Sequence, residues 1–333
     1  MRKFNLKGTV VERMKGIQRQ NPVNHETKKE NKPETPEISA EFSELQGTFL
    51  VAWRTDVGKL RKNNQDAIIL GNGLAGVADG MGGHLGGEIA SSGLRDGLLR
   101  EIKGCEPGAD ILSQAVRKVN RELWEKQEED ASLTGMGTTL TILWPAKDRM
   151  IIGQIGDSRA YLLRDGKMVQ VTSDHSMVAD MVRKGVLTEE QAACHPMRNY
   201  ITRAVGTEED VEIDITFHDR VKGDRWLICS DGLYGMVPKD SLSALASSDD
   251  PEETAQRLLQ AALDGGGRDN ISLVILQDET DIPEPEKNEG TSPDSLKENT
   301  AVISGQPEDS PESETKEEDA APETDHSTEV APQ

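Results

Sequence analysis

Aspartates at the ends of short apolar segments carry the clearest chemistry in this sequence. Asp79 follows the apolar segment 74–78 and opens a loop with five glycines between positions 80 and 87. Because few side chains crowd such a loop, an ion or a phosphate can approach its backbone. A tight turn before a helix also uses glycine, and one Gly-rich loop does not separate the two interpretations. The carboxylate at the strand end favours a binding site.

Four more aspartates stand in similar places, each next to an apolar segment and near Gly or Asn. They are Asp66, Asp157, Asp231 and Asp269. Any one of them is typical of a turn or a helix cap. Five carboxylates gathered on strand ends, however, repel one another unless cations neutralise them. Oxygen ligands without clusters of His or Cys favour Mg²⁺ or Mn²⁺ over zinc, so the sequence predicts a metal centre with oxygen ligands.

The elements that would position these aspartates are mostly strands. Alternating or continuous apolar segments predict strands at 48–53, 67–70, 74–78, 138–143, 149–155, 160–163, 168–171, 211–217, 225–230 and 271–277. The four strands between 138 and 171 indicate an antiparallel meander, which the polar segment 173–198 with two short helices then interrupts.

Helices are predicted between these groups of strands. One has the apolar stripe Leu94, Leu98 and Ile102, the next has the stripe Ile111, Ala115, Val119 and Leu123, and two more span 238–246 and 251–263. Because helices and strands do not alternate as βαβ units, the predicted fold class is α+β.

Composition divides the 333 residues into three regions. Residues 1–46 form a basic and polar arm, and residues 279–333 form a tail with 17 acidic residues against 3 lysines. Neither region has enough apolar residues to offset the entropy of ordering, so we expect both to be disordered. The folded domain is therefore expected at 47–278.

Composition also limits where the protein works and what it binds. Three widely spaced cysteines without a C-x-x-C pattern indicate a reducing compartment. No apolar segment follows the basic start, so we expect no signal peptide, and without a run of roughly 20 apolar residues we expect no membrane span. The acidic balance argues against nucleic-acid binding. We expect a cytoplasmic monomer.

Eight short motifs occur in the order typical of one known family. They are RKNNQDA (61–67), VADGMGGH (77–84), GMGTTL (135–140), GDSRAY (156–161), SDHS (173–176), ITRAVG (201–206), SDGL (230–233) and GRDN (267–270). Over residues 48–278 the chain resembles the PPM-type (type 2C) metal-dependent Ser/Thr protein phosphatases, bacterial branch. The resemblance implies a sandwich of two antiparallel β-sheets flanked by α-helices. It also implies a flap at about 173–205.

The resemblance implies a role for each site residue. Asp79 and the Gly80 carbonyl would bind Mn²⁺ or Mg²⁺, with Asp231 and Asp269 completing the shell of one ion and Asp66 acting on the second. Asp157 would help to hold a third ion, although anchoring of its strand is an alternative. Arg61 would grip the substrate phosphate, where a bidentate guanidinium suits the geometry; a solvated loop arginine is the alternative.

The sequence departs from the family pattern after Asp79 and Gly80. Many members have His at the next position, as a proposed acid for the leaving oxygen, whereas this chain has Met81. A thioether cannot donate a proton, so His84, water or no acid would serve instead. Gln65 likewise replaces the Glu of some relatives, and neither change removes the expected metal ligands.

The expected function is hydrolysis of phosphoserine and phosphothreonine in proteins by a metal-bridged water, which reverses bacterial Ser/Thr kinase signalling. Phosphoproteins and the kinases that produce them are the implied partners. One alternative is another binuclear phosphoesterase, such as a nuclease. The other is an inactive binding module that keeps the fold; its mark would be missing metal ligands, and the sequence has them all.

Overall fold

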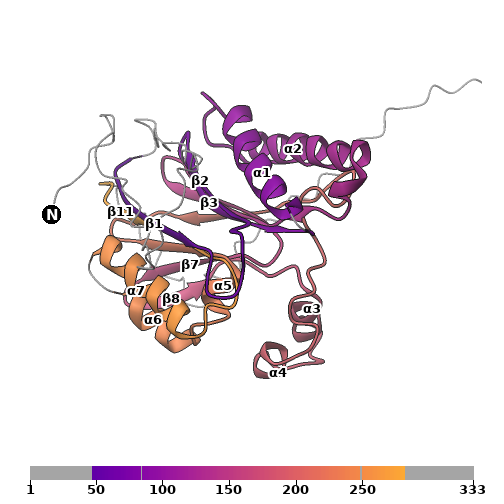
Figure 1. Cartoon of the computed structure of the whole chain (residues 1–333). Coiled ribbons are helices and arrows are strands. Elements are labelled where there is room, and N and C mark those ends of the chain that lie inside the picture. The colour runs from indigo at the N-terminus through magenta and orange to yellow at the C-terminus, as the bar shows by residue number, and fades with distance from the viewer. Residues whose placement is uncertain (1–46, 84, 248–249, 282–333) are drawn as a thin grey trace, which may run out of the picture. The chain divides into compact units, whose positions relative to one another are not determined.

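Two antiparallel β-sheets form the centre of the structure (Figure 1), a computed structural model that describes residues 47–83, 85–247 and 250–281. One sheet has the order β1 (Phe49–Asp56), β11 (Ile271–Asp278), β10 (Arg225–Cys229), β7 (Arg159–Arg164) and β8 (Lys167–Gln170). The other has the order β2 (Asp66–Gly71), β3 (Leu74–Met81), β5 (Leu140–Pro145), β6 (Arg149–Ile155) and β9 (Asp214–Asp219), and the short β4 (Gly137–Thr138) also pairs with β3.

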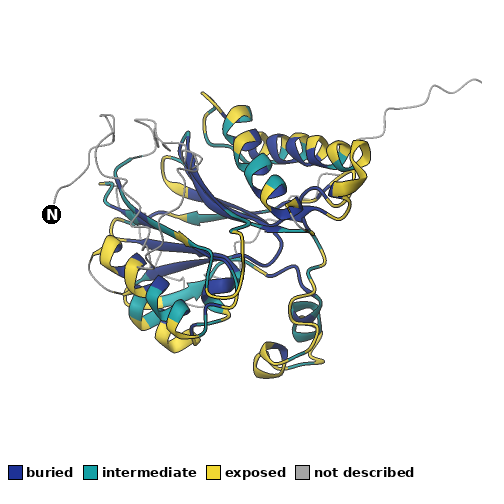
Figure 2. Ribbon diagram, viewed as in Figure 1, coloured by how far each residue is buried: buried dark blue, intermediate teal, exposed yellow. Residues whose placement is uncertain are grey.

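Helices cover the outer face of each sheet, and their exposed sides face away from the strands (Figure 2). α1 (Gly86–Glu101) and α2 (Ala109–Glu129) belong to the six-stranded sheet, and a 3-10 turn, η1 (Ala131–Leu133), follows them. α5 (Asp231–Tyr234), α6 (Lys239–Ala246) and α7 (Pro251–Asp264) belong to the five-stranded sheet. The predicted α+β sandwich flanked by helices is confirmed.

Three apolar clusters hold these layers together. In β11, Leu273 and Ile275 pack toward the helices α5 to α7, whereas Val274 and Leu276 pack between the two sheets. Successive residues of a strand point to opposite faces, and both faces of this strand are covered. The third cluster lies between the six-stranded sheet and the first two helices.

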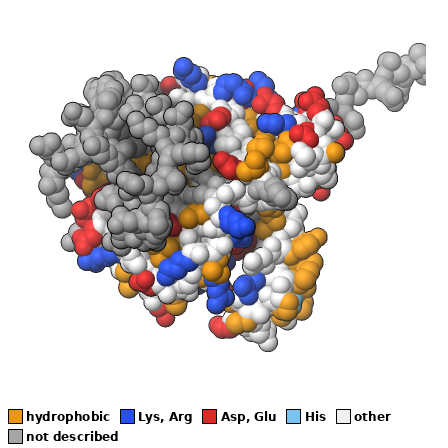
Figure 3. All heavy atoms as spheres, in the orientation of Figure 1, with side chains coloured by type: hydrophobic (Ala, Val, Ile, Leu, Met, Phe, Trp, Pro, Cys, Tyr) orange, Lys and Arg blue, Asp and Glu red, His pale blue; other side chains and the backbone are white. Residues whose placement is uncertain are grey.

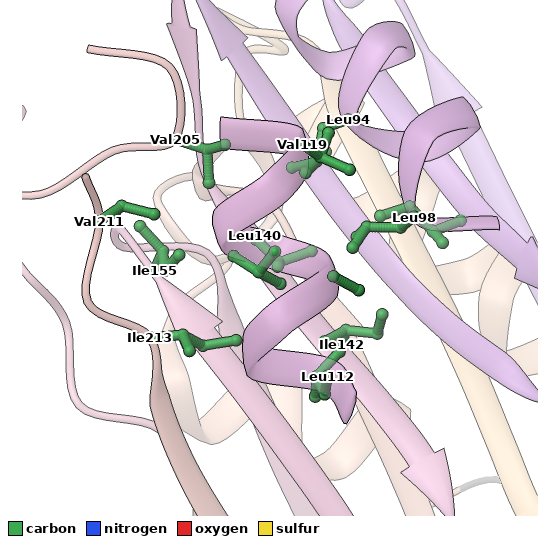
Figure 4. Packing of buried hydrophobic residues seen from close by; sticks show 14 of the residues in the cluster. Leu94, Leu98, Leu112, Val119, Leu140, Ile142, Ile155, Val205, Val211 and Ile213 are labelled. Atoms are coloured by element: carbon green, nitrogen blue, oxygen red, sulfur yellow. The ribbon is translucent and has the colours of Figure 1, made fainter. Parts of the chain in front are cut away.

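The packing of α2 corrects one prediction. The sequence predicts Ile111 in the apolar stripe, but this residue is 36% exposed and Leu112 is buried instead. Figure 4 shows Leu112 near Ile142 of β5 and Val119 near Leu94 of α1, all in one buried cluster. The buried stripe runs through positions 112, 115, 116, 119 and 123, a mixture of three- and four-residue steps, because a helix turns every 3.6 residues.

The predicted meander over 138–171 is wrong in its connectivity. β5 and β6 are neighbours in one sheet, but β7 and β8 are neighbours in the other. The chain changes sheets at Gly156, whose φ of +93° suits glycine, and a Cβ there would lie 2.6 Å from Thr139. This change of sheet places Asp157 at the edge shared by both sheets.

A small lobe stands apart from the sandwich in Figure 1 and consists of α3 (Met177–Arg183) and α4 (Glu189–Ala193). Its two ends meet at a bridge between Ser176 and Ile201. Thr188 begins α4 with a capping box that it forms with Gln191. Figure 3 shows hydrophobic side chains gathered on this lobe, where Val186 is 66% exposed.

Three segments or residues for which the sequence makes predictions lie outside the described residues. They are the basic arm 1–46, His84 and the acidic tail from residue 282 onward. Among the described residues, no helix has the length and apolar character needed to cross a bilayer.

Candidate metal centre

Four of the five predicted aspartates lie at strand ends on one edge of the sandwich. Asp66 begins β2 and stands opposite Asp79 of the antiparallel β3. Asp231 is the first residue of α5 and lies two residues after β10, and Asp269 lies two residues before β11. Since β10 and β11 are antiparallel, the end of the first and the start of the second share an edge. The strand ends therefore gather residues that are far apart in sequence.

The carboxylates lie close enough to act on one another. Burial raises the pKa of Asp79 well above its ordinary value, and the charges of Asp66, Asp231, Asp157 and Asp269 raise it further. All five predicted aspartates therefore belong to one electrostatic cluster. Such a cluster favours a bound cation, because a positive charge stabilises the ionised form of every member.

The other members of the cluster are shifted in the same direction. Burial raises the pKa of Asp66 to about 6, with a smaller contribution from Asp269 and despite the opposing hydrogen bonds of Ser272 and Ser230. Burial followed by the charges of Asp157 and Asp269 raises the pKa of Asp231 to about 8.

Asp157 lies in the turn between β6 and β7, and this turn brings it to the cluster. Burial followed by the charge of Asp174 raises its pKa to about 6. Its carbonyl oxygen accepts a hydrogen bond of 3.0 Å from the Tyr234 hydroxyl, which ties this turn to α5.

One oxygen in the cluster fits a cation directly. The buried Oδ1 of Asp66 has no hydrogen-bond partner among the described residues, whereas its Oδ2 accepts a bond of 2.8 Å from Ser230 Oγ. A buried unpaired carboxylate oxygen is costly, and a hard cation is a suitable partner for it. In the described part of the chain, no three acidic, His or Cys side chains already surround a common point as metal ligands do.

Hydroxyl side chains fix the backbone at Asp79. Thr139 Oγ1 accepts a bond of 2.9 Å from the Asp79 amide, and the Asp79 carbonyl accepts bonds from the Thr139 amide and Thr138 Oγ1. The sequence alone predicts no role for these threonines or for Ser230. The motifs GMGTTL and SDGL contain them, but only the fold shows what they contact.

Gly80 is the closest backbone contact of the site. A Cβ at this residue would lie 2.1 Å from the carbonyl oxygen of Gly87 and 2.4 Å from that of Gln65. Real Cβ atoms essentially never approach so closely. The glycine therefore allows the start of α1 to pack against β3 beside Asp79. By contrast, a Cβ added to the exposed Gly83, three residues further on, would have no atom of the described residues within 4 Å, its chain neighbours aside.

Arg61, the predicted phosphate contact, lies next to Asp269 of the cluster. Its Nη2 is 2.7 Å from Asp269 Oδ2, and its side chain is 49% exposed. The guanidinium therefore lies at the solvent side of the cluster, where an incoming phosphate can reach it.

Asn270 holds the loop that carries Arg61. Its amide nitrogen Nδ2 donates to the carbonyls of Val57 and Asn63, and its Oδ1 accepts from the Gln65 amide. The Asn270 backbone amide donates to Asp269 Oδ1 at 2.8 Å. Asn270 therefore positions both residues of the ion pair. Its side chain holds the loop of Arg61, and its backbone amide orients the carboxylate of Asp269.

Comparison with known proteins assigns the chain to a family. A family profile described as Protein phosphatase 2C matches residues 59–265. The chain belongs to the protein phosphatase 2C family. This membership confirms the resemblance to bacterial PPM-type phosphatases, and the matched range of the protein phosphatase 2C profile includes four of the five clustered aspartates.

Two bacterial serine/threonine phosphatases are similar to this protein phosphatase 2C family member. Serine/threonine protein phosphatase PstP of Mycobacterium tuberculosis is 42% identical over 227 residues, which cover 67% of this chain and 44% of PstP. The chain thus spans less than half the length of that relative. Serine/threonine phosphatase stp of Listeria innocua is 35% identical over 242 residues, which cover 68% of this chain and 94% of the relative.

Solved structures of the protein phosphatase 2C family share the same fold. The crystal structure of the M. tuberculosis serine/threonine phosphatase PstP/Ppp has 40% sequence identity and a TM-score of 0.66, covering 69% of this chain and 99% of that one. The catalytic domain of PstP in complex with 2 manganese ions has 38% identity and a TM-score of 0.64, covering 69% of this chain and 97% of that one.

Proposed function

We propose that the chain is a metal-dependent protein phosphatase that hydrolyses phosphoserine and phosphothreonine monoesters. The observation that carries the proposal is the meeting of five aspartates from both sheets at one edge, beside an exposed arginine. Relatives at 42% and 35% identity are named serine/threonine phosphatases, and one similar structure contains two manganese ions.

Within this proposal, Asp79 and the Gly80 carbonyl bind Mn²⁺ or Mg²⁺ together with Asp66, Asp231 and Asp269, and Asp157 contributes to a third ion. When bound, such ions activate water and neutralise charge on the phosphoryl oxygens. Arg61 binds the phosphate through charge-assisted hydrogen bonds and so fixes its orientation toward the carboxylate cluster. Ser230, Thr139 and Asn270 hold the ligand-bearing strands and loops in place.

The fold and family also guide proposals about the setting. We propose residues 47–278 as the phosphatase domain, with 173–205 as a flap beside the site. Phosphoproteins and the Ser/Thr kinases that phosphorylate them are the proposed partners, and the cytoplasm is the proposed location of a monomer. His84 stays a predicted proton donor.

Replacing Arg61 with Ala is expected to lower kcat/KM for a phosphothreonine peptide by about ten- to a hundredfold, chiefly through KM, because one or two charge-assisted hydrogen bonds are lost. The free energy of unfolding should change by less than about 0.5 kcal/mol, since the pair with Asp269 is exposed. Steady-state kinetics and thermal unfolding measure the two effects. An unchanged kcat/KM would leave Arg61 as an ordinary solvated arginine.

The proposed reaction is tested by phosphate release from phosphothreonine, phosphoserine and phosphotyrosine peptides in Mn²⁺, in Mg²⁺ and in excess chelator. We expect metal-dependent release that favours the first two peptides. Folded protein that releases no phosphate with either metal would support the inactive binding module instead. Cleavage of the phosphodiester backbone of DNA or RNA, without phosphate release from the phosphopeptides, would support a nuclease.

A further inference from the structure

Two loops beside the carboxylate cluster carry exposed cations. The loop 57–63 contains Lys59, Arg61 and Lys62 and no acidic residue, and the neighbouring loop 265–269 contains Arg268. All four side chains belong to exposed residues. This concentration of positive charge is unexpected in a chain whose formal net charge is −22.

The two loops lie side by side and are held there by the backbone. The Lys59 amide donates to the Gly267 carbonyl at 2.6 Å, and a Cβ on Gly58 would lie 2.2 Å from the Asp269 carbonyl oxygen. The Asn270 side chain also binds both ends of the loop 57–63. These contacts fix the backbone that carries Lys59, Lys62 and Arg268. We call these three residues the basic rim.

The cations of the basic rim are available to an anionic ligand. Arg61 pairs with Asp269, but within the described residues Lys59, Lys62 and Arg268 form no ion pair with a carboxylate. The acidic residues that border the two loops are already engaged: Asp56 Oδ1 accepts from the Gly58 amide, Asp264 Oδ1 accepts from Gln260 Nε2, and Asp269 pairs with Arg61. Unpaired exposed cations beside a site raise the local concentration of anionic ligands.

We propose that the basic rim selects phosphoprotein segments in which acidic residues flank the phosphorylated Ser or Thr. The inference rests on the proposed function, because the phosphate on Arg61 sets the position of the peptide. An extended chain advances about 3.3–3.6 Å per residue, so side chains one to three positions from the phosphorylated residue fall within about 10 Å of Arg61. Lys59 and Lys62 lie one or two residues from Arg61 and suit this range.

The test compares two phosphothreonine peptides that differ only in charge, one with Glu at the three positions on each side of the phosphothreonine and one with Gln. For the full chain with Mn²⁺ at low ionic strength, we expect kcat/KM to be about fivefold higher for the Glu peptide, since each exposed pair contributes modestly. The ratio should fall toward 1 in about 0.5 M salt, where exposed charges are screened.

A triple variant, Lys59→Gln with Lys62→Gln and Arg268→Gln, should bring the Glu-to-Gln ratio close to 1. The matched control is Lys103→Gln with Lys147→Gln and Lys167→Gln, which removes the same charge from exposed positions outside the two loops and should keep the wild-type ratio. Circular dichroism checks the folding of both variants.

Equal kcat/KM for both peptides in the wild type, or an undiminished ratio in the triple variant, would overturn the inference. Binding of the chain's own acidic segment 279–333 to the rim would give equal values in the wild type and a rise for both peptides in the triple variant, which also overturns it. Failure of the wild type to release phosphate from either peptide would instead count against the proposed function.

Discussion

Asp79→Asn is expected to lower phosphate release from a phosphothreonine peptide by about 10³-fold or more, because a neutral amide replaces the central carboxylate of the proposed metal site. The substitution preserves shape, so the fold should persist. The carboxylate of Asp79 interacts unfavourably with four other aspartates. Without metal, the variant should therefore unfold at the same temperature as the wild type or at a higher one.

The control for this variant is Asp240→Asn, at an exposed position in the first turn of α6. It should change phosphate release less than twofold. Kinetics in Mn²⁺ and thermal unfolding in chelator give the two measurements. Full activity of Asp79→Asn would remove this residue from the centre of the site, and a large loss of stability would show that its role is structural.

Gly80→Ala is expected to destabilise the fold by about 3 kcal/mol or more and to abolish activity. The added methyl group would lie 2.1 Å from one carbonyl oxygen and 2.4 Å from another, so β3 and the start of α1 must separate. Such a separation would also displace Asp79, which is the adjacent residue.

Gly83→Ala is the matched control, since it adds the same methyl group to the same loop at a position where the described residues, apart from its chain neighbours, leave the space within 4 Å open. Its free energy of unfolding should stay within about 0.5 kcal/mol of the wild type. Denaturant unfolding measures both variants. Equal stability of Gly80→Ala and Gly83→Ala would contradict the close backbone contact at Gly80.

The sequence predicts the positions of most strands, and the places of the aspartates near the strand ends, because both depend on local patterns. β2, β3, β10 and β11 are apolar segments with Asp and Gly near one end. An Asp near the end of a strand lies close to the edge of the sheet. Asp79 is therefore placed by its neighbours alone. The four-residue helix α5 has no such local signal, and the sequence does not predict it.

Sheet membership cannot be read in the same way. The strands before and after Asp157 resemble successive strands of a meander, and only packing of both faces determines that the chain changes sheets there. The contacts of Ser230 with Asp66, and of Thr139 with Asp79, likewise join residues distant in sequence. A single sequence has no pattern that specifies such pairs.

The burial of Leu112 in place of the predicted Ile111 also depends on packing between distant segments. Both residues are apolar and adjacent, so a four-residue repeat fits either of them. The choice depends on how α2 is rotated against the sheet, and that rotation follows from the strand residues beneath it.

Calorimetric titration of Mn²⁺ into the chelator-treated full chain tests the central claim most directly. We expect saturable binding of at least two ions to the wild type and the loss of at least one of them in Asp79→Asn. A folded wild type that binds no Mn²⁺, or an Asp79→Asn variant that binds as many ions with the same affinity, would contradict the assignment of the carboxylate cluster as a metal centre.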